Sequence, residues 1–392
     1  MKDISILFFL NSFSKVLVLI FTLILIRVLS VEEYAYFISV FTFYNILFQL
    51  LCGIIERLYV VETKQFLENF LCNISNLYFF IILLPANYFL FYKGLSYFLL
   101  IIILSTSSLF LQLLRIIMQK QERFKTYALL EITRNILWLI VGILIVYDYK
   151  QGNFVYILYS HAILSLLIFI IGIKKVPSQI GSISKSFTYL NNKKSLISYS
   201  VLAGLFPYIV FIATDKFGSN YDISALGAAL RYQAILSLVV LSINTVVLSQ
   251  IGNVSILKNY VKNLWKKVYL AVTICLLFIL CVYFLIPFID GGKYPDSKNY
   301  FLLLSATTIL SLFNLPPVSI LLKKMQYGKI LKSLLVSLTV TATLVFALYY
   351  FLGIEALQSI EILLFSMIFA YMINLMINVW QCLRLQYEDI DC

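Results

Sequence analysis

The sequence is poor in charged residues, since Asp, Glu, Lys and Arg make up 12% of its 392 residues, against roughly 25% in a typical soluble domain. Hydrophobic residues make up 62% and aromatic residues 16%, and the mean hydropathy is +0.95. Too little polar surface is available to cover a water-soluble globule, so lipid must solvate most of the chain. This composition excludes an ordinary soluble enzyme, a disordered chain and a fibrous coiled coil.

Residue patterns that bind metals are also lacking. His161 is the only histidine, and the six cysteines form no Cys-x-x-Cys pair. A zinc site or a disulfide framework is therefore not expected, and we predict no resident cofactor. The apolar stretch after Met1 runs to Ile26 without a small-residue cleavage site, so we interpret it as a retained first span.

What the sequence does contain is a series of apolar stretches of about 20 residues, the length that crosses a bilayer as a helix. Twelve such stretches are predicted: 4–28, 34–55, 74–92, 95–118, 128–147, 154–173, 198–214, 224–248, 267–289, 299–322, 330–352 and 359–380. We expect an all-α polytopic membrane protein of about 12 transmembrane helices in two six-helix bundles. The expected domains are an N-terminal bundle (1–176), a basic cytoplasmic linker (177–197), a C-terminal bundle (198–380) and a cytoplasmic tail (381–392).

Lysine and arginine positions predict the orientation of these spans, because cytoplasmic loops are enriched in both residues. With the N-terminus inside, 20 loop and tail cations fall on the cytoplasmic side and 5 on the other side. Both termini are then cytoplasmic. The formal net charge of +12 is explained by this topology and by acidic lipid headgroups, so no nucleic-acid partner is expected.

Five further cations fall inside the predicted spans, where each costs about 2.5 to 3.5 kcal/mol at a helix centre. They are Lys15, Arg27, Arg115, Arg134 and Arg231. Such groups usually face a bundle interior, a water-filled cavity or a partner. For Lys15 and Arg231 we favour a cavity, whereas Arg27 and Arg115 lie near span ends and fit snorkelling to headgroups equally well.

Polar residues at helical spacing accompany these cations and predict hydrophilic stripes that line the same space. The stripes include Asn11, Asn45, Gln49, Ser108 and Gln112. An alternative is that these side chains simply join helices to one another.

Three other ionisable residues also bear on the predicted site. Glu131 lies one turn before Arg134, and we favour an internal ion pair between them over substrate contact. Glu56 and Glu131 are also candidates for coupling transport to H⁺ or Na⁺. His161 is expected to be a hydrogen-bonded interior residue.

Prolines at 85, 207, 287, 316 and 317 interrupt four spans and predict kinks of the kind that alternating access uses.

Two short motifs resemble those of a known family. The stretch from Arg27 to Phe37, RVLSVEEYAYF, resembles the R-x-L-s-x-e-e-Y-G-x-F junction between the first two spans of Wzx-type polysaccharide flippases. These belong to the multidrug/oligosaccharidyl-lipid/polysaccharide superfamily. A second match, Asp215 to Gly218 followed by Ala225 to Tyr232, looks like the motif after span 7. Ala35 replaces the glycine that is common in the family.

The resemblance implies a flippase of the cell inner membrane that carries undecaprenyl-diphosphate-linked oligosaccharides, the repeat units of O-antigen or capsule, from the cytoplasmic to the periplasmic leaflet. It also implies a polysaccharide polymerase and a chain-length regulator as partners. The five buried cations would then contact the diphosphate, the polar stripes would contact the sugar, and the prenyl tail would stay in lipid.

Three other functions compete with this one. A membrane polysaccharide polymerase or ligase is expected to have a large external loop, yet the long loop here is on the inner side. A drug/cation antiporter of the same superfamily would need a carboxylate within the first spans, where spans 1 and 3 have none. A scaffold would not need deep cations.

Overall fold

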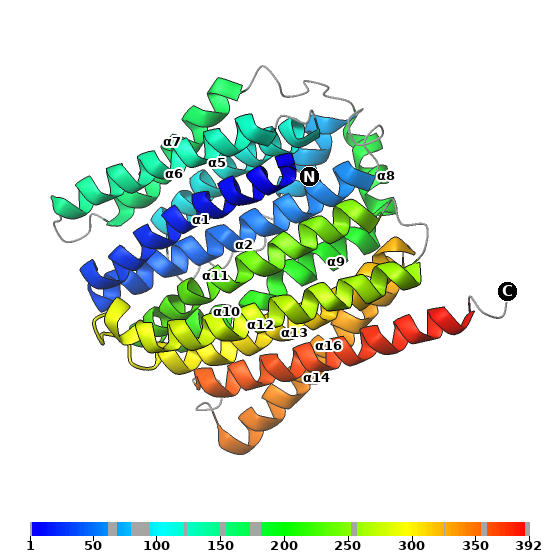
Figure 1. Ribbon diagram of the computed structural model, residues 1–392. Coiled ribbons are helices and arrows are strands. Elements are labelled where there is room, and N and C mark those ends of the chain that lie inside the picture. The colour runs from blue at the N-terminus through cyan, green and yellow to red at the C-terminus, as the bar shows by residue number, and fades with distance from the viewer. Residues whose placement is uncertain are drawn as a thin grey trace. The chain divides into compact units, whose positions relative to one another are not determined.

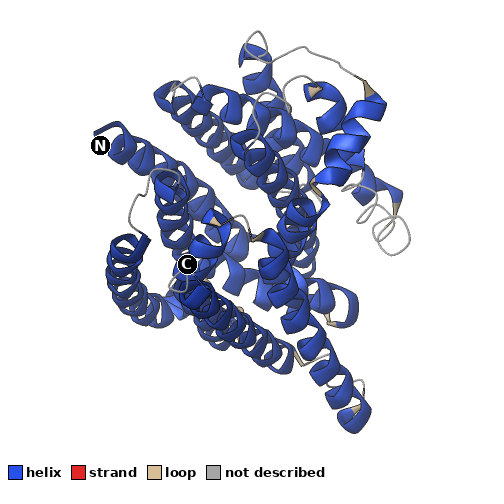
Figure 2. Ribbon diagram, turned by 90° about the vertical axis from the view of Figure 1, so that its right-hand side faces the viewer, coloured by secondary structure: helices blue, strands red, loops and turns tan. Residues whose placement is uncertain are grey.

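The computed structural model describes residues 2–61, 69–79, 94–120, 124–148, 154–172, 182–251, 257–324, 326–353 and 359–388. Within these ranges the regular structure consists of helices, and no strand is present (Figure 2). The chain divides into two compact units, Met1–Tyr208 and Ile209–Cys392. The all-α fold class is therefore confirmed.

In the part of the first unit that the structure describes, five long helices are followed by three short helical elements. Its elements are α1 (Lys2–Val28), α2 (Val31–Val61), α5 (Leu95–Lys120), α6 (Phe124–Tyr147), α7 (Phe154–Gly172), α8 (Ile183–Asn192), α9 (Lys194–Leu205) and the 3₁₀ helix η2 (Phe206–Tyr208). Within this unit α1 packs on α6, α7 packs on both α5 and α6, and α2 packs on α5 and α9 (Figure 1). A further helical segment covers residues 70–79.

The second unit is arranged around one central helix. Its elements are α10 (Ile209–Phe217), α11 (Asn220–Ile251), α12 (Leu257–Ile289), α13 (Ser297–Lys323), α14 (Tyr327–Leu352) and α16 (Ile360–Glu388). Helix α13 packs against α16, α11, α12 and α14, so it forms the core of this unit.

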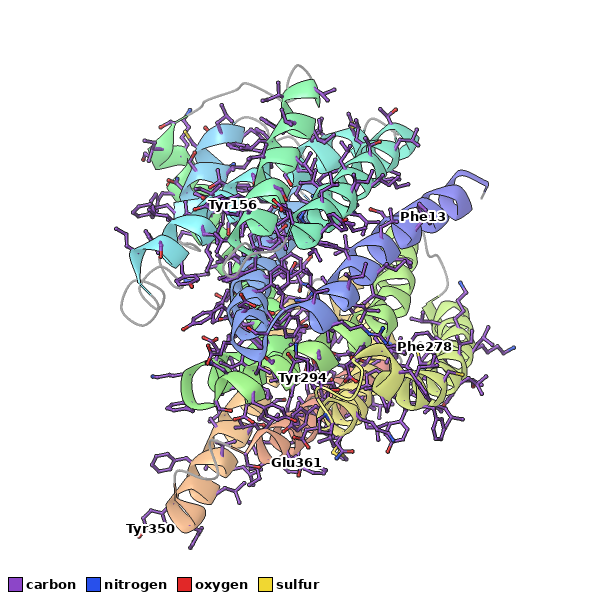
Figure 3. The ribbon with its side chains drawn as sticks, turned by 90° about the vertical axis from the view of Figure 1, so that its left-hand side faces the viewer. Phe13, Tyr156, Phe278, Tyr294, Tyr350 and Glu361 are labelled. Carbon is purple, nitrogen blue, oxygen red and sulfur yellow. The ribbon has the colours of Figure 1, made fainter. Side chains whose placement is uncertain are left out.

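Nine helical segments in the described part of the chain are long and apolar enough to cross a membrane. Every predicted span except 74–92 coincides with described helix, and 74–92 is described only to residue 79. These helices expose large apolar side chains, for example Leu277 and Phe284 on α12. Tyr350 at the end of α14, labelled in Figure 3, is 79% exposed. Exposed apolar surface on this scale fits a lipid environment.

The segment predicted as a linker and the predicted seventh span have more structure than expected. Residues 177–197 include all of α8 and the start of α9, and the boundary between the two units falls at Tyr208, inside the predicted span 198–214. Pro207 lies in η2, which interrupts the helix there as predicted. Pro287 and the Pro316–Pro317 pair lie inside α12 and α13, and Pro85 lies outside the described residues.

The first family-like motif builds the start of α2, and the two parts of the second lie on either side of the start of α11. At α2, the Glu33 N–H donates to Ser30 Oγ (3.2 Å) while the Ser30 N–H donates to the Glu33 carboxylate (3.0 Å). At α11, Ser219 and Asp222 make the same pair of bonds at 3.2 and 2.9 Å. Each is a capping box, which satisfies backbone donors that a helix start leaves free.

The glycine of the second motif has a steric role at the same place. A Cβ on Gly218 would lie 2.8 Å from the Thr214 carbonyl oxygen and 3.2 Å from the Asp222 Cβ. Only glycine lets the chain turn this closely from α10 into α11. Ser30, Glu33, Gly218 and Asp222 therefore hold helix junctions.

Candidate functional site

A buried arginine in the first unit is the strongest candidate for a functional group. Arg134 in α6 is only 8% exposed. Its Nε and Nη2 both donate to Asn135 Oδ1, at 3.0 and 2.8 Å, and its Nη1 lies 3.5 Å from Ser165 Oγ in α7. The guanidinium is therefore held in a fixed direction between two helices.

The partners of Arg134 are fixed in turn by a third helix. Asn135 Nδ2 donates to both the carbonyl oxygen and the hydroxyl of Ser14 in α1, at 3.1 and 2.7 Å. Ser165 Oγ donates to the His161 carbonyl one turn earlier in α7, at 2.8 Å. We call Ser14, Arg134, Asn135, His161 and Ser165 the Arg134 cluster.

The electrostatics of this cluster differ from the sequence-based expectation. We predicted an ion pair between Glu131 and Arg134, but within the described residues Arg134 bonds only to a neutral amide and a neutral hydroxyl. The prediction was wrong because the guanidinium extends towards α7. A buried cation is costly unless it is paired, so Arg134 keeps a positive charge that an anion could neutralise.

His161 lies beside this charge in a cage of aromatic rings. Its imidazole is 4.6 Å from Trp138, 5.6 Å from Tyr44 and 6.3 Å from Phe41, measured between ring centroids, and the residue is 3% exposed. Burial was predicted correctly. The expected hydrogen bond is missing at Nδ1, which has no partner in the described part of the chain.

Several residues of the predicted polar stripes form hydrogen bonds within the protein. The Ser108 and Tyr44 hydroxyls share a hydrogen bond of 2.7 Å between α5 and α2, and Gln112 is buried on the same helix as Ser108. Asn45 donates to the Phe41 carbonyl of its own helix (2.8 Å), and Gln49 donates to the Tyr208 hydroxyl (2.7 Å). These contacts fit the alternative in which such residues join helices.

The structure describes the side chains of two of the other four predicted cations. Arg27 is exposed in the last turn of α1, and Arg231 is half-buried on α11 of the second unit. The side chains of Lys15, Arg115, Asn11 and Glu56 lie outside the described part of the chain. Their membership of a common binding site stays a prediction.

A polar cluster in the second unit was missed from the sequence. Asn314 of α13 donates to Asn374 of α16 (2.6 Å), and Asn378 donates to both Asn314 and Asn374 (3.0 Å each). Ser333 of α14 donates to Asn378 Oδ1 (2.7 Å) and accepts from Asn374 Nδ2 (3.2 Å). We call these four residues the asparagine network. The spacing of Asn374 and Asn378, one helical turn apart, was the available signal.

Hydrogen bonds that involve a tyrosine and two aspartates connect the loops at one end of the second unit. The Tyr221 hydroxyl donates to Asp296 (3.0 Å), and Asp290 accepts from the Gly292 N–H (2.9 Å) and the Ser297 hydroxyl (3.2 Å). Burial, together with the Asp296 carboxylate, raises the pKa of Tyr221 to about 12. Burial is also the main reason that the pKa of Tyr294 rises to about 12.

The described residues contain no group of three or more side chains suited to a metal ion.

Comparison with known proteins gives a match at the level of the fold. No protein-family model and no curated protein matches the sequence. Among solved structures, lipid II flippase MurJ in an inward closed conformation is similar with a TM-score of 0.66 and 19% identity, over 97% of this chain and 87% of that one.

Two MATE transporters are similar as well. They are AtDTX14, a eukaryotic protein (TM-score 0.54, 12% identity, 97% of this chain and 94% of that one), and a mutant of VcmN from Vibrio cholerae (0.51, 14%, 99% and 96%). MurJ and the MATE transporters both belong to the multidrug/oligosaccharidyl-lipid/polysaccharide superfamily. The chain therefore has the fold of these transporters, and its long apolar helices make it a multi-pass membrane protein.

Proposed function

We propose that this protein is a Wzx-type flippase that moves undecaprenyl-diphosphate-linked oligosaccharide repeat units from the cytoplasmic to the periplasmic leaflet, for O-antigen or other surface polysaccharide assembly. The observation that carries the proposal is the buried Arg134, whose hydrogen-bond partners are neutral. The likeness to a lipid II flippase supports a lipid-linked cargo.

The chemistry of the cargo explains why such an arginine is needed. A diphosphate diester carries about two negative charges and loses its water and counterions when it leaves the headgroup layer. A guanidinium can replace part of that solvation with charge-assisted hydrogen bonds, which are roughly twice as strong as neutral ones. Arg134 is pre-oriented for this role because Asn135 and Ser165 restrict its rotamer.

The remaining parts of the site follow from the sequence. Lys15, Arg27, Arg115 and Arg231 are proposed to contact the diphosphate at different stages of transport. Asn11, Asn45, Gln49, Ser108 and Gln112 are proposed to offer hydrogen bonds to the sugar once the bundles rearrange. Glu56 and Glu131 are the proposed carboxylates for coupling to H⁺ or Na⁺.

The proposed membrane location and protein partners follow from the same cargo. We place the protein in the inner membrane with both termini in the cytoplasm, with the polysaccharide polymerase and the chain-length regulator as partners. An inside-negative potential would assist outward movement of an anion, by about 2.3 kcal/mol per charge per 100 mV.

A second candidate function is export of small organic cations, which the likeness to two MATE transporters favours. The sign of the buried charge distinguishes the two candidate functions. A site for cations needs a negative group, whereas Arg134 presents a positive one to the interior of the first unit.

The test is genetic and chemical. Deletion of the gene should cause lipid-linked repeat units to accumulate on the inner leaflet, and Arg134→Gln should fail to restore surface polysaccharide at a normal membrane level of the protein. Arg384→Gln is the matched control, because Arg384 lies over the Trp380 ring (4.6 Å) on an exposed part of α16. Normal polysaccharide in the deletion strain, with increased sensitivity to cationic drugs, would favour the antiporter instead.

A further inference from the structure

The inference concerns the unpaired nitrogen of His161. The residue is 3% exposed, and rings of Trp138, Tyr44 and Phe41 surround it. Buried polar atoms nearly always have a hydrogen-bond partner, so an exception calls for an explanation. A nitrogen that keeps its lone pair unshared is available to accept a proton.

The Arg134 charge controls whether His161 can take that proton. The two residues are joined through Ser165, which lies 3.5 Å from the guanidinium and donates to the His161 carbonyl at 2.8 Å. Adding a proton to the imidazole would place two positive charges among neutral partners. Like charges repel, so the Arg134 charge disfavours a protonated imidazole unless an anion offsets it.

The charged and titratable groups near His161 come from several helices of the first unit. Among the described side chains, α6 contributes the charged Arg134 and, one turn earlier, Glu131. Helix α2 contributes the Tyr44 phenol, which shares a hydrogen bond with the neutral Ser108 of α5. In α1, Ser14 reaches the cluster through Asn135, and Lys15 follows it with its side chain outside the described part. A negative charge that arrives from outside would change this balance.

We propose that His161 is a proton site that fills when an anion binds at Arg134, so that the diphosphate and one proton occupy the cluster together. This rests on the proposed function. The proton comes from the water that enters with the cargo and forms an N–H bond at Nδ1. Imidazolium and guanidinium then match the two negative charges of a diphosphate diester, which Arg134 alone would leave half-neutralised. When the anion leaves, repulsion from Arg134 returns the proton to water.

The probe for a test must not titrate by itself. A farnesyl diphosphate esterified to N-acetylglucosamine meets this need, because both phosphates are diesters. Binding to the purified full-length protein is measured by calorimetry in buffers of different ionisation enthalpy, between about pH 6 and pH 8, where histidine normally titrates. The wild type should take up close to one proton per probe, and its affinity should rise as the pH falls, by at most tenfold per pH unit for one linked proton.

Two variants identify the group that takes up the proton. His161→Gln should still bind the probe, with proton uptake abolished and an affinity that no longer changes with pH. Tyr156→Phe is the control, because Tyr156 is a titratable residue of the same helix that is 62% exposed (Figure 3), and it should behave as the wild type. Unchanged proton uptake in His161→Gln would overturn the inference.

The wild-type measurement separates the two proposals even if His161→Gln fails to fold. Binding without proton uptake overturns the His161 proposal and leaves the flippase proposal standing. Absence of binding by the wild type overturns both. Binding with proton uptake that Arg134→Gln also shows would place the anion elsewhere, and it would likewise refute the link between the two residues.

Discussion

Two serines of α14 offer a matched test of how strongly the asparagine network holds the second unit. Ser333 and Ser337 lie one turn apart and are both fully buried. Ser337 donates only to the Ser333 carbonyl of its own helix (2.7 Å). Ser333 shares its proton between the Ile330 carbonyl and Asn378 Oδ1, and also accepts from Asn374. Alanine at either position removes the same atom, so only the contacts with α16 differ.

The expected difference follows from these bonds. Interhelical hydrogen bonds within membranes are worth about 0.6 kcal/mol on average and at most about 1.7. Ser333 takes part in two of them, and its loss leaves the buried Asn378 Oδ1 without the donor that Ser333 provides, which adds about 1 kcal/mol or more. Ser333→Ala should therefore destabilise the protein by about 2 kcal/mol, and Ser337→Ala by less than about 0.5.

Reversible unfolding in mixed micelles with increasing denaturing detergent measures this difference. Asn378→Ala serves as a second variant and should resemble Ser333→Ala, because the same network is broken from α16. Equal effects of Ser333→Ala and Ser337→Ala would refute the reasoning, since the contacts between helices would then contribute nothing beyond burial of a hydroxyl.

Three further predictions concern packing, orientation and pH. Gly142→Ala should lower the melting temperature, because a Cβ there would overlap the Phe21 ring where α1 packs on α6, whereas Gly53→Ala, with no atom within 4 Å, should not. In a cysteine-free background, a membrane-impermeant maleimide should label Asp296→Cys from outside intact cells and Thr188→Cys only after permeabilisation; the reverse pattern would contradict the predicted topology. The raised pKa of Tyr294 means that its stabilisation is complete below the unfolded value near 10 and is lost as the pH rises towards 12. Melting curves of Tyr294→Phe should therefore decline less than those of the wild type across that range, and parallel declines would count against it.

The parts of the fold that depend on local sequence were predictable. Spans follow from runs of apolar residues, and the break at Pro207 follows from the lost backbone donor. The starts of α2 and α11 were not predicted, although the pairs Ser30–Glu33 and Ser219–Asp222 are local signals of the same kind. In each case the residues that determine the feature lie within a few positions of one another.

Side-chain partners over long sequence separations could not be predicted in the same way. Asn135 and Ser14 are 121 positions apart, and their bond depends on the register with which α6 packs on α1. Arg134 likewise bonds to Ser165, 31 positions away on α7. A sequence pattern identifies which face of a helix is polar, but it does not identify the helix that packs there.

The family-like motifs illustrate what a short resemblance measures. Ser30, Glu33 and Gly218 belong to these motifs, and they serve capping or close approach at two junctions. Their presence is therefore evidence for the fold, which the structural comparisons support independently. Evidence for the cargo has to come from residues that lower the stability of the fold. Arg134 is the described residue that fits this condition best, because its charge is buried.

The neutral partners of Arg134 lead to a last prediction. A carboxylate beside the guanidinium would stabilise it, yet the same carboxylate would compete with an anionic cargo and would have to be displaced. Asn135→Asp introduces this change in an isosteric side chain, exchanging the amide that donates to Ser14 for an acid that pairs with Arg134. We expect a stability within about 1 kcal/mol of the wild type, since the ion pair offsets the lost bonds to Ser14. Binding of the diphosphate probe should weaken at least about tenfold, because like charges meet in the site. Undiminished binding by a folded Asn135→Asp protein would mean that the anion does not approach Arg134, and the proposed role of this cluster would fall with it.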